Sequence, residues 1–450
     1  MNYQDYFKGK KITLMGLGLL GRGVGDAKFL AECGADLIVT DLKSEKELGP
    51  SLTKLTKLKA ITYVLGKHEL ADFKDRDLII KAAGVPLDSP FIAEARKNGI
   101  PIMMSTALFV YLAGRRAKLS GAKIIGITGT RGKTTTTQLI YEIIKQAKIG
   151  KVWLGGNVLG VSTLALLPKV KPEDWVVLEL DSWQLQGFGE LKISPHIAVF
   201  TNFMPDHLNY YKGDTQAYLA DKENIFKYQK SGDHLIRGET VEKLPKSWKL
   251  KILGEHNRIN AACAVAVARI LEIPEKVIKK TVEKFTGVSG RLELVRTWRG
   301  IKIYNDTTST TPDALRVALE ALGAPRLRSG QNQNIVLILG GADKNLEIKD
   351  ELIKVIQKYC REIILLPGTG TEKLRRLLPS KVGAPTRASG FKEAKSMPEA
   401  VASALNMAKK GDILLLSPGF ASFGKPPGGF KNEYDRGDQF VKLVKKSTRR

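Results

Sequence analysis

The sequence predicts an α/β protein built from three domains. Its 450 residues exceed what one hydrophobic core usually supports. Three stretches each alternate short apolar runs with helical patterns, which is typical of parallel sheets covered by helices. Two of the apolar runs lead into glycine-rich turns followed by a helical pattern. We place the domains at residues 1–112, 113–288 and 289–450.

The composition is that of a soluble globular protein, with 43% hydrophobic and 26% charged residues. No apolar run approaches the ~20 residues needed to cross a bilayer. The N-terminus lacks an apolar core followed by small residues, so we expect no secretory signal and a cytoplasmic protein. Three cysteines lie far apart without metal-type spacing, and we expect them to be small buried hydrophobes.

The chain is basic, with 72 Lys and Arg against 46 Asp and Glu and a net charge of +26. Such an excess suits nucleic acid or a phosphate-rich substrate. The basic residues are scattered, apart from a cluster at residues 445–450, and no zinc-finger or aromatic-basic RNA motif accompanies them. We therefore expect no nucleic-acid partner, and a nucleic-acid-stimulated ATPase stays as the alternative from another class.

The first domain opens with a strand pattern at residues 11–16 and the turn Gly16-x-Gly18-x-x-Gly21. A second strand pattern ends at Asp41, twenty residues after Gly21. This spacing matches the dinucleotide fingerprint and predicts a Rossmann-like domain. A nicotinamide oxidoreductase is the rival enzyme class, but a lone fingerprint is a weak signal.

The second domain carries the strongest motif, a strand pattern at residues 123–127, glycines at 126, 129 and 132, and then Lys133-Thr134-Thr135. A glycine-rich turn at a helix N-terminus points backbone N–H groups and the positive end of the helix dipole at one spot, which favours a polyphosphate. Lys133 adds a charge, and Thr134 can place its hydroxyl on Mg²⁺. The strict spacing would need a glycine where Ile127 stands, so this is a variant P-loop, and it predicts an ATPase domain with a mainly parallel sheet.

Polar residues follow two further strand patterns of this domain, at residues 175–180 and 196–200. The carboxyl ends of parallel strands meet at one edge of a sheet, so these residues should face the phosphate loop. Glu179 and Asp181 are candidate Mg²⁺ ligands. His207 follows the next strand and could hold a second metal, although an isolated histidine is more often structural.

The third domain repeats the alternation, with apolar runs at residues 301–306, 335–340, 362–367 and 412–417. This pattern predicts a second Rossmann-like domain. Its charged and hydroxyl residues give no site on their own.

Taken together, the motifs resemble those of the Mur ligases of peptidoglycan synthesis, from end to end of the chain. The matching segments are Gly16-Leu-Gly-Leu19, residues 128–135, Gly156-Asn157, residues 179–184, Thr201-Asn-x-x-x-Asp-His207, Lys222, residues 254–260, residues 290–293, Asn305-Asp306, Gly340-Gly341, residues 415–422 and Phe430-Lys-Asn432 with Arg436-Gly437. The resemblance implies an ATP-dependent ligase that forms an amide through an acyl phosphate. For the N-terminal domain it implies a nucleotide-sugar site.

The resemblance also implies roles for individual residues. Catalysis would involve Lys133, His207 and Lys222, the last as a carbamylated lysine. ATP would be held by Gly129, Thr130, Gly132, Lys133, Thr134, Thr135, Asn257, Asn260, Arg291 and Asp306. Two Mg²⁺ ions would be held by Thr134, Glu179, His207 and Lys222. Substrate contacts would be Leu19, Leu20, Asp41, Asn157, Lys344 and Ser422.

The implied substrates are UDP-N-acetylmuramoyl-L-alanine and D-glutamate, acted on by a monomer. The Asp-Asn-Pro-Arg signature of the diamino-acid-adding members is absent, which favours glutamate. Thr308 stands where a lysine is usual, and Glu433 where an aromatic residue is usual. Within the superfamily, a folylpolyglutamate-synthetase-like ligase is the alternative, although it would not need an N-terminal nucleotide-diphosphate turn.

Overall fold

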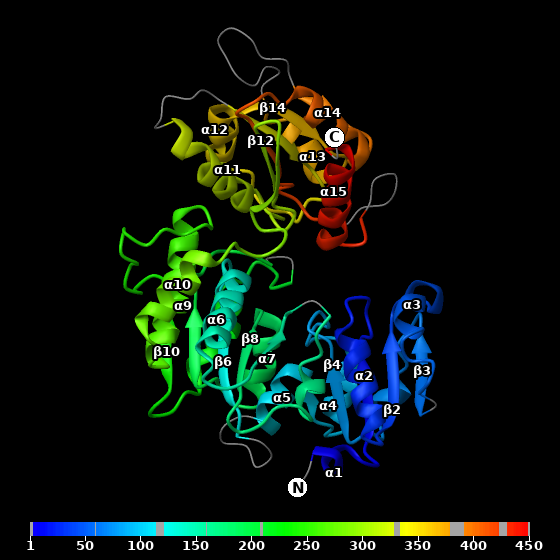
Figure 1. Cartoon of the computed structure of the whole chain (residues 1–450). Helices are drawn as coiled ribbons and strands as arrows, with labels where there is room; N and C mark the ends of the chain where they lie inside the picture. Colours follow the sequence, from blue (N-terminus) through cyan, green and yellow to red (C-terminus); the bar gives the residue numbers. More distant parts are fainter. Residues whose placement is uncertain are drawn as a thin grey trace. The chain divides into compact units, whose positions relative to one another are not determined.

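The computed structural model describes residues 3–58, 60–113, 121–158, 160–207, 210–327, 334–378, 391–422 and 430–448, without the side chains of residues 324–327. These residues form three sheets with helices packed on them (Figure 1). The chain divides into two compact units, one of residues 1–246 with 259–282 and one of residues 247–258 with 283–450. The first unit contains two of the sheets, so the expectation of three α/β domains is confirmed, while their exact boundaries stay predictions.

The N-terminal sheet has the order β3-β2-β1-β4-β5, and all its strands are parallel. The strands are β1 Lys11–Met15, β2 Asp36–Asp41, β3 Ile61–Leu65, β4 Leu78–Lys81 and β5 Ile102–Met103. The helices are α1 Tyr3–Phe7, α2 Arg22–Glu32, α3 Glu45–Leu52, the 3₁₀ turn η1 Leu70–Phe73, α4 Pro90–Lys97 and α5 Ser105–Ala113.

The central sheet has the order β10-β9-β6-β8-β7 and is also parallel throughout. The strands are β6 Lys123–Thr128, β7 Val152–Gly156, β8 Trp175–Glu179, β9 Ile197–Phe200 and β10 His234–Arg237. The helical segments are α6 Lys133–Ala147, η2 Leu164–Leu166, α7 Ser182–Glu190, α8 Thr215–Lys227, α9 Glu255–Ile270 and α10 Glu275–Lys284. Strand β6 lies between β8 and β9, so the turn after β6 has the ends of both neighbours beside it.

The second unit holds a sheet of order β11-β12-β16-β13-β14-β15, parallel except for the antiparallel pair β11–β12. The strands are β11 Glu293–Trp298, β12 Ile301–Asn305, β13 Ile335–Leu339, β14 Cys360–Leu365, β15 Lys392–Glu393 and β16 Ile413–Leu416. The helices are α11 Pro312–Leu327, α12 Asp350–Tyr359, α13 Thr369–Arg375, α14 Met397–Met407 and α15 Glu433–Ser447.

The N-terminal and central sheets of the first unit share one hydrophobic core. A single cluster of buried side chains includes Ile12 and Leu30 of the first domain and Ile124 and Val176 of the second. Helix α5 belongs to this cluster through Leu108, which is fully buried. Burial of apolar surface is the main favourable term in folding, so the two domains stabilise one another.

The cysteines and the hydropathy pattern agree with the expectations from sequence. Cys33, Cys263 and Cys360 are all buried and free. Within the described residues, no helix is both long and apolar enough to cross a membrane.

A buried lysine at the end of β4 was not expected. Lys81 is only 2% exposed, and its ammonium donates to Val85 O at 3.0 Å. Burial lowers the pKa of Lys81 to about 8, although the charges of Glu190, Asp181 and Asp221 oppose the shift. A charged group that is removed from water without a close partner costs free energy.

We predict that Lys81→Met stabilises the protein at pH 7, by on the order of 1–3 kcal/mol. Because the folded pKa lies below the unfolded one, the cost of Lys81 is fully present below pH 8. It disappears as the pH rises towards the unfolded pKa of about 10.5. Melting temperatures at pH 7 and pH 10 measure this, and an equal gain at both pH values would contradict it.

Candidate functional site

The turn between β6 and α6 forms an open helix N-terminus. Gly132 caps α6 with a φ of 84°, and no side chain of the described residues caps the helix. Ile127 on β6 pairs with Glu179 on β8, and Thr128 pairs with Phe200 on β9. The sheet thus brings the phosphate loop beside the ends of β8 and β9, as expected from sequence.

Two glycines of this loop lie where no other side chain fits. A Cβ on Gly129 would stand 2.0 Å from Thr201 Oγ1, and one on Gly132 would stand 2.1 Å from Asn260 Oδ1. Both residues also have positive φ values, 136° and 84°. Sterics and backbone conformation therefore both require glycine here.

We predict that Gly132→Ala abolishes nucleotide binding and lowers the melting temperature. Gly213→Ala is the matched control, because Gly213 has a φ of 86° but no atom within 4 Å of an added Cβ. The control should show only the left-handed backbone cost of about 1 kcal/mol. Calorimetric ADP titration with melting curves measures both variants, and equal effects would contradict the role of the Asn260 contact.

The loop after β9 is joined to the phosphate loop by hydrogen bonds that sequence reasoning missed. Thr130 N donates to Asn202 O at 2.9 Å, and Arg131 N donates to Asn202 Oδ1 at 2.9 Å. The Arg131 guanidinium donates to Asp206 Oδ2 at 2.7 Å. Only the spacing Asn202-x-x-x-Asp206 hinted at this arrangement, which makes the two loops one structural element.

Two lysines converge on one carbonyl oxygen. Lys133 Nζ donates to Gly129 O at 3.0 Å, and Lys222 Nζ donates to the same oxygen at 2.9 Å. Lys222 is 1% exposed on α8. Burial, followed by the charge of Lys133, lowers the pKa of Lys222 well below its ordinary value. Two ammonium groups that share one carbonyl oxygen repel one another, which favours either a bound anion or the loss of one of the two charges.

The carboxylates at the end of β8 have different roles. Glu179 is buried and lies beside Ile127 in the sheet register. Asp181 is instead the N-cap of α7, where its side chain accepts from Gln184 N at 2.7 Å. Helix capping accounts for Asp181, which leaves Glu179 as the better metal candidate of the two.

His207 is held in an unusual backbone conformation. Its φ is 55°, and its N–H donates to Asp206 Oδ1 at 2.8 Å. The imidazole packs against Trp183, with ring centroids 4.7 Å apart. Left-handed backbone in a residue with a side chain is strained and often marks a functional position.

The predicted substrate residues of the N-terminal turn lie near the central domain. Leu19 and Leu20 are exposed, and Leu20 O accepts from Gly160 N at 3.1 Å. Asp41 Oδ2 accepts from Gly18 N at 2.9 Å. Asn157 Oδ1 accepts from the Arg22 guanidinium at 2.7 Å. Asp41 therefore fixes the shape of the glycine turn, whatever else it contacts.

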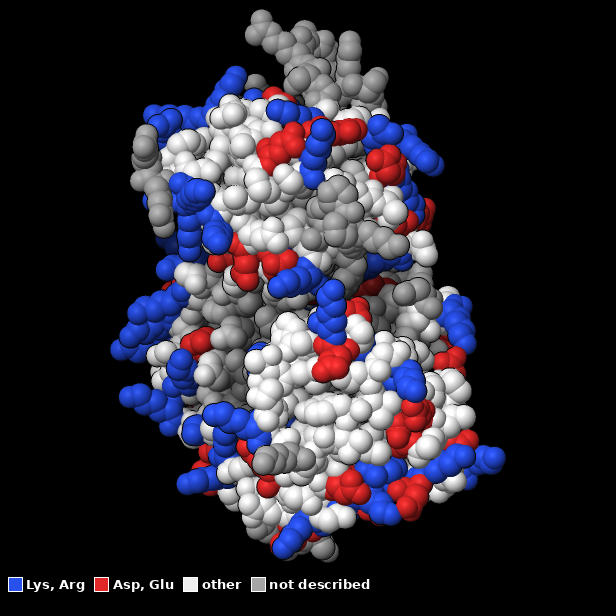
Figure 2. Space-filling view, turned by 90° about the vertical axis from the view of Figure 1, so that its right-hand side faces the viewer, with Lys and Arg blue, Asp and Glu red and all other residues white. Residues whose placement is uncertain are grey.

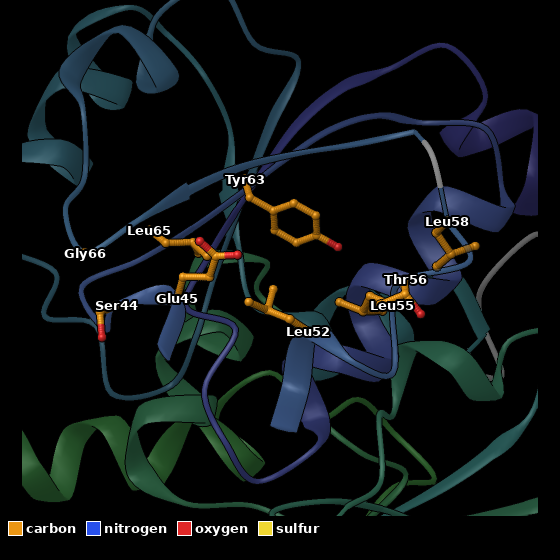
Figure 3. A pocket seen from close by; sticks show the side chains of 9 residues that line it. All are labelled: Ser44, Glu45, Leu52, Leu55, Thr56, Leu58, Tyr63, Leu65 and Gly66. Carbon is orange, nitrogen blue, oxygen red and sulfur yellow. The ribbon is translucent and has the colours of Figure 1, made fainter. Parts of the chain in front are cut away.

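The N-terminal domain also contains a cavity of about 500 Å³, which the sequence did not predict. It lies between α3 with the segment after it and strand β3, and the Tyr63 ring projects into it (Figure 3). Its lining residues are Ser44, Glu45, Leu52, Leu55, Thr56, Leu58, Tyr63, Leu65 and Gly66. None of the predicted substrate residues lines this cavity.

The second unit brings together several predicted residues of its own. Asp306 accepts from Ser417 Oγ at 2.8 Å and from Leu292 N at 3.0 Å. Burial raises the pKa of Asp306 to about 7, against the effect of these hydrogen bonds and of Arg291. Lys344 Nζ donates to Thr310 Oγ1 at 3.0 Å. The buried Ser422 Oγ has no hydrogen-bond partner among the described residues.

The two asparagines among the predicted ATP contacts fall in different units. Asn257 lies in the second unit, where its Nδ2 donates to Leu253 O at 2.8 Å. Asn260 lies in the first unit, where its backbone carbonyl oxygen accepts from Thr136 Oγ1 at 3.5 Å. Of this pair, only Asn260 is placed beside the phosphate loop by the described contacts.

A fully buried arginine holds the loop after β12. Arg436 donates to Thr307 O at 2.8 Å and to Phe420 O at 3.2 Å. Thr307 Oγ1 in turn donates to Glu433 O at 2.8 Å. The unusual Thr308 donates from its hydroxyl to Gly290 O at 2.9 Å. Both departures from the expected motif thus lie within one hydrogen-bonded cluster, and the matching Arg436, to which the sequence analysis assigned no role, is at its centre.

The surface charge is dispersed on the face shown in Figure 2. Lys and Arg side chains are interspersed there with Asp and Glu.

Three family models match the chain in succession. Residues 10–104 match "Mur ligase MurD-like, N-terminal domain", residues 127–241 match "Mur ligase middle domain" and residues 290–420 match "Mur ligase, glutamate ligase domain". Together they span most of the chain and all three sheets.

Curated relatives and solved structures are similar over the whole length. The UDP-N-acetylmuramoylalanine–D-glutamate ligase of Roseiflexus sp. (strain RS-1) is 35% identical over 98% of this chain and 99% of its own. The enzyme of that name from Borreliella afzelii (strain PKo) is 32% identical, with 98% of each chain covered. The crystal structure of UDP-N-acetylmuramate-alanine ligase from Thermotoga maritima shares the fold, with a TM-score of 0.60, 21% identity, and 97% and 100% of the chains covered.

Proposed function

The chain belongs to the Mur ligase family, and from that premise we propose that it joins D-glutamate to UDP-N-acetylmuramoyl-L-alanine at the expense of ATP. The convergence of Lys133 and Lys222 on Gly129 O carries the ATP-binding part of this proposal, because Lys133 and the N–H groups of a helix N-terminus together attract a phosphate. The names and full-length similarity of the curated relatives supply the substrates. A peptidoglycan precursor that reacts with ATP implies a cytoplasmic enzyme.

The phosphate loop is the proposed site of ATP. Residues 129–135 supply backbone N–H groups at the start of α6, and Lys133 supplies a point charge. Asn260 touches the loop through Gly132. From the second unit, Asn257, Arg291 and Asp306 stay proposed nucleotide contacts.

The candidate ligands fit Mg²⁺, which needs few protein ligands, better than a metal ion whose ligands all come from the protein. Among the described residues, no group of three His, Cys, Asp or Glu side chains is placed to hold a metal. Mg²⁺ usually keeps several waters and takes one or two protein ligands together with substrate phosphates. Thr134 would hold one ion, and Glu179 and His207, with a modified Lys222, a second. Bound Mg²⁺ would neutralise charge on the phosphates.

The proposed chemistry has two steps. The substrate carboxylate attacks the γ-phosphorus of ATP, giving an acyl phosphate and ADP. The amine of D-glutamate then attacks the acyl carbon, and phosphate leaves as the amide forms. Lys133 and the N–H groups of α6 would stabilise the charge that builds on the phosphoryl oxygens.

We propose that Lys222 is carbamylated. The neutral amine attacks CO₂, a C–N bond forms, and a proton passes to solvent. The lowered pKa of this buried amine supports the proposal, because only the neutral form is nucleophilic. With ¹³C-bicarbonate we expect a carbamate resonance that Lys222→Met lacks, and a wild-type spectrum without that signal would refute the modification.

The amino-acid pocket is proposed to include Lys344 and Ser422. The Lys344 ammonium is only part-buried beside Thr310, so it can attract an acidic side chain. The unpartnered Ser422 hydroxyl can hydrogen-bond a carboxylate. These two groups support an acidic acceptor rather than a basic one.

Phosphate release with UDP-N-acetylmuramoyl-L-alanine, ATP and a panel of D- and L-amino acids tests the function. In the presence of the acyl substrate and ATP, we expect D-glutamate to be the only amino acid of the panel that supports turnover. Lys133→Ala should lower turnover about 10²–10³-fold, whereas Lys145→Ala, an exposed lysine on the same helix, should not. Release without the acyl substrate, or a preference for another amino acid, would refute the assignment.

A further inference from the structure

The glycine turn of the N-terminal domain is packed against the central domain. A Cβ on Gly21 would lie 3.2 Å from Gly160 Cα. In the next turn of α2, Asp26 Oδ1 accepts from Ser162 Oγ at 2.6 Å, and both residues are buried. The third glycine of the dinucleotide fingerprint therefore makes room here for a backbone segment of another domain.

Arg22 fixes the orientation of the Asn157 amide across this contact. Its Nη1 donates to Asn157 Oδ1 at 2.7 Å. A guanidinium has no acceptor, so the atom that faces it must be the amide oxygen. The Asn157 backbone is also held, because its N–H donates to Glu179 O. The side-chain NH₂ group of Asn157 is therefore directed away from Arg22.

The groups gathered at this place are hydrogen-bond donors. Gly21 caps α2 without a side-chain hydrogen bond, so the first N–H groups of the helix have no side-chain cap. The Asn157 NH₂ group adds a further donor, and its direction is fixed by the hydrogen bond from Arg22 Nη1 to Asn157 Oδ1. A set of N–H donors at a helix N-terminus suits an anionic oxygen, as in a diphosphate or carboxylate.

We propose that Arg22 is a positioning residue for the acyl substrate, which turns the Asn157 amide so that its NH₂ group donates to an anionic oxygen between the nucleoside and acyl ends. This inference rests on the proposed function. Arg22 acts through Asn157, so its loss weakens binding of the acyl substrate and leaves the chemical step largely intact.

The test compares KM for UDP-N-acetylmuramoyl-L-alanine with kcat in Arg22→Met, Arg22→Lys and Lys28→Met. We expect Arg22→Met to raise KM about 10-fold and to keep kcat within about 3-fold of the wild-type value. The rise in KM corresponds to the loss of one charge-assisted hydrogen bond. Arg22→Lys should retain most of the affinity, because it keeps a charged donor. Lys28→Met is the matched control, since exposed Lys28 lies on the same helix and pairs only weakly with Glu32.

Variants of Asn157, the residue to which Arg22 donates, provide a second test. Asn157→Asp should raise KM more than Asn157→Ala, because a carboxylate still accepts from Arg22 but repels the anionic oxygen. Arg22→Met combined with Asn157→Ala should equal Asn157→Ala alone, because the two residues act as a unit. Calorimetric titration of the acyl substrate without ATP should give the same order of affinities, and melting curves should show that each variant is folded.

The outcomes separate this inference from the function. A wild-type protein without turnover refutes the proposed ligase and this inference with it. An active wild type in which Arg22→Met keeps its KM, or in which the Arg22 and Asn157 effects add, refutes the inference alone. A rise in KM for Lys28→Met as large as for Arg22→Met would likewise refute it, because general loss of positive charge would then explain the result.

Discussion

The meeting of two lysine side chains at one carbonyl oxygen is the constraint on which the site of the first unit depends. Lys133 and Lys222 both donate to Gly129 O, and nothing but glycine fits at that residue because Thr201 lies against it. The loop after β9 therefore packs directly against the residue whose carbonyl oxygen the two lysines share. Its bonds to Thr130 and Arg131 put it there. The site thus depends on the two loops together with α6 and α8, the helices that carry Lys133 and Lys222.

The fold was predictable from sequence because most strands of the three sheets are continuous apolar runs. β6, β8 and β13 are buried along nearly their whole length, and their expected ends were correct within a residue or two. Strands β3 and β10 lie at sheet edges and are largely part-buried or exposed. They therefore lack the continuous apolar pattern of a central strand, and the sequence did not reveal them.

Site residues that lie close together in the sequence could be predicted from it. Residues that only the fold brings together could not. The glycines and Lys133 lie within eight residues of one another, so their spacing reports their geometry. Lys222 is 93 residues from Gly129 and looks like any helix lysine. Arg131, Asp206 and Arg436 bind partners brought together only by the sheets. The burial of Lys81 without a carboxylate partner and the burial of Arg436 on α15 against backbone carbonyl oxygens leave no trace in a linear pattern.

The common core of the N-terminal and central domains has a consequence for substrate choice. Because Ile12 and Ile124 belong to one packed cluster, the glycine turn and the phosphate loop cannot slide past one another without opening that core. The distance between the glycine turn and the phosphate loop is therefore fixed. In the proposed reaction, an acyl donor whose nucleotide and carboxyl ends are spaced differently from these two loops could not occupy both of them at once.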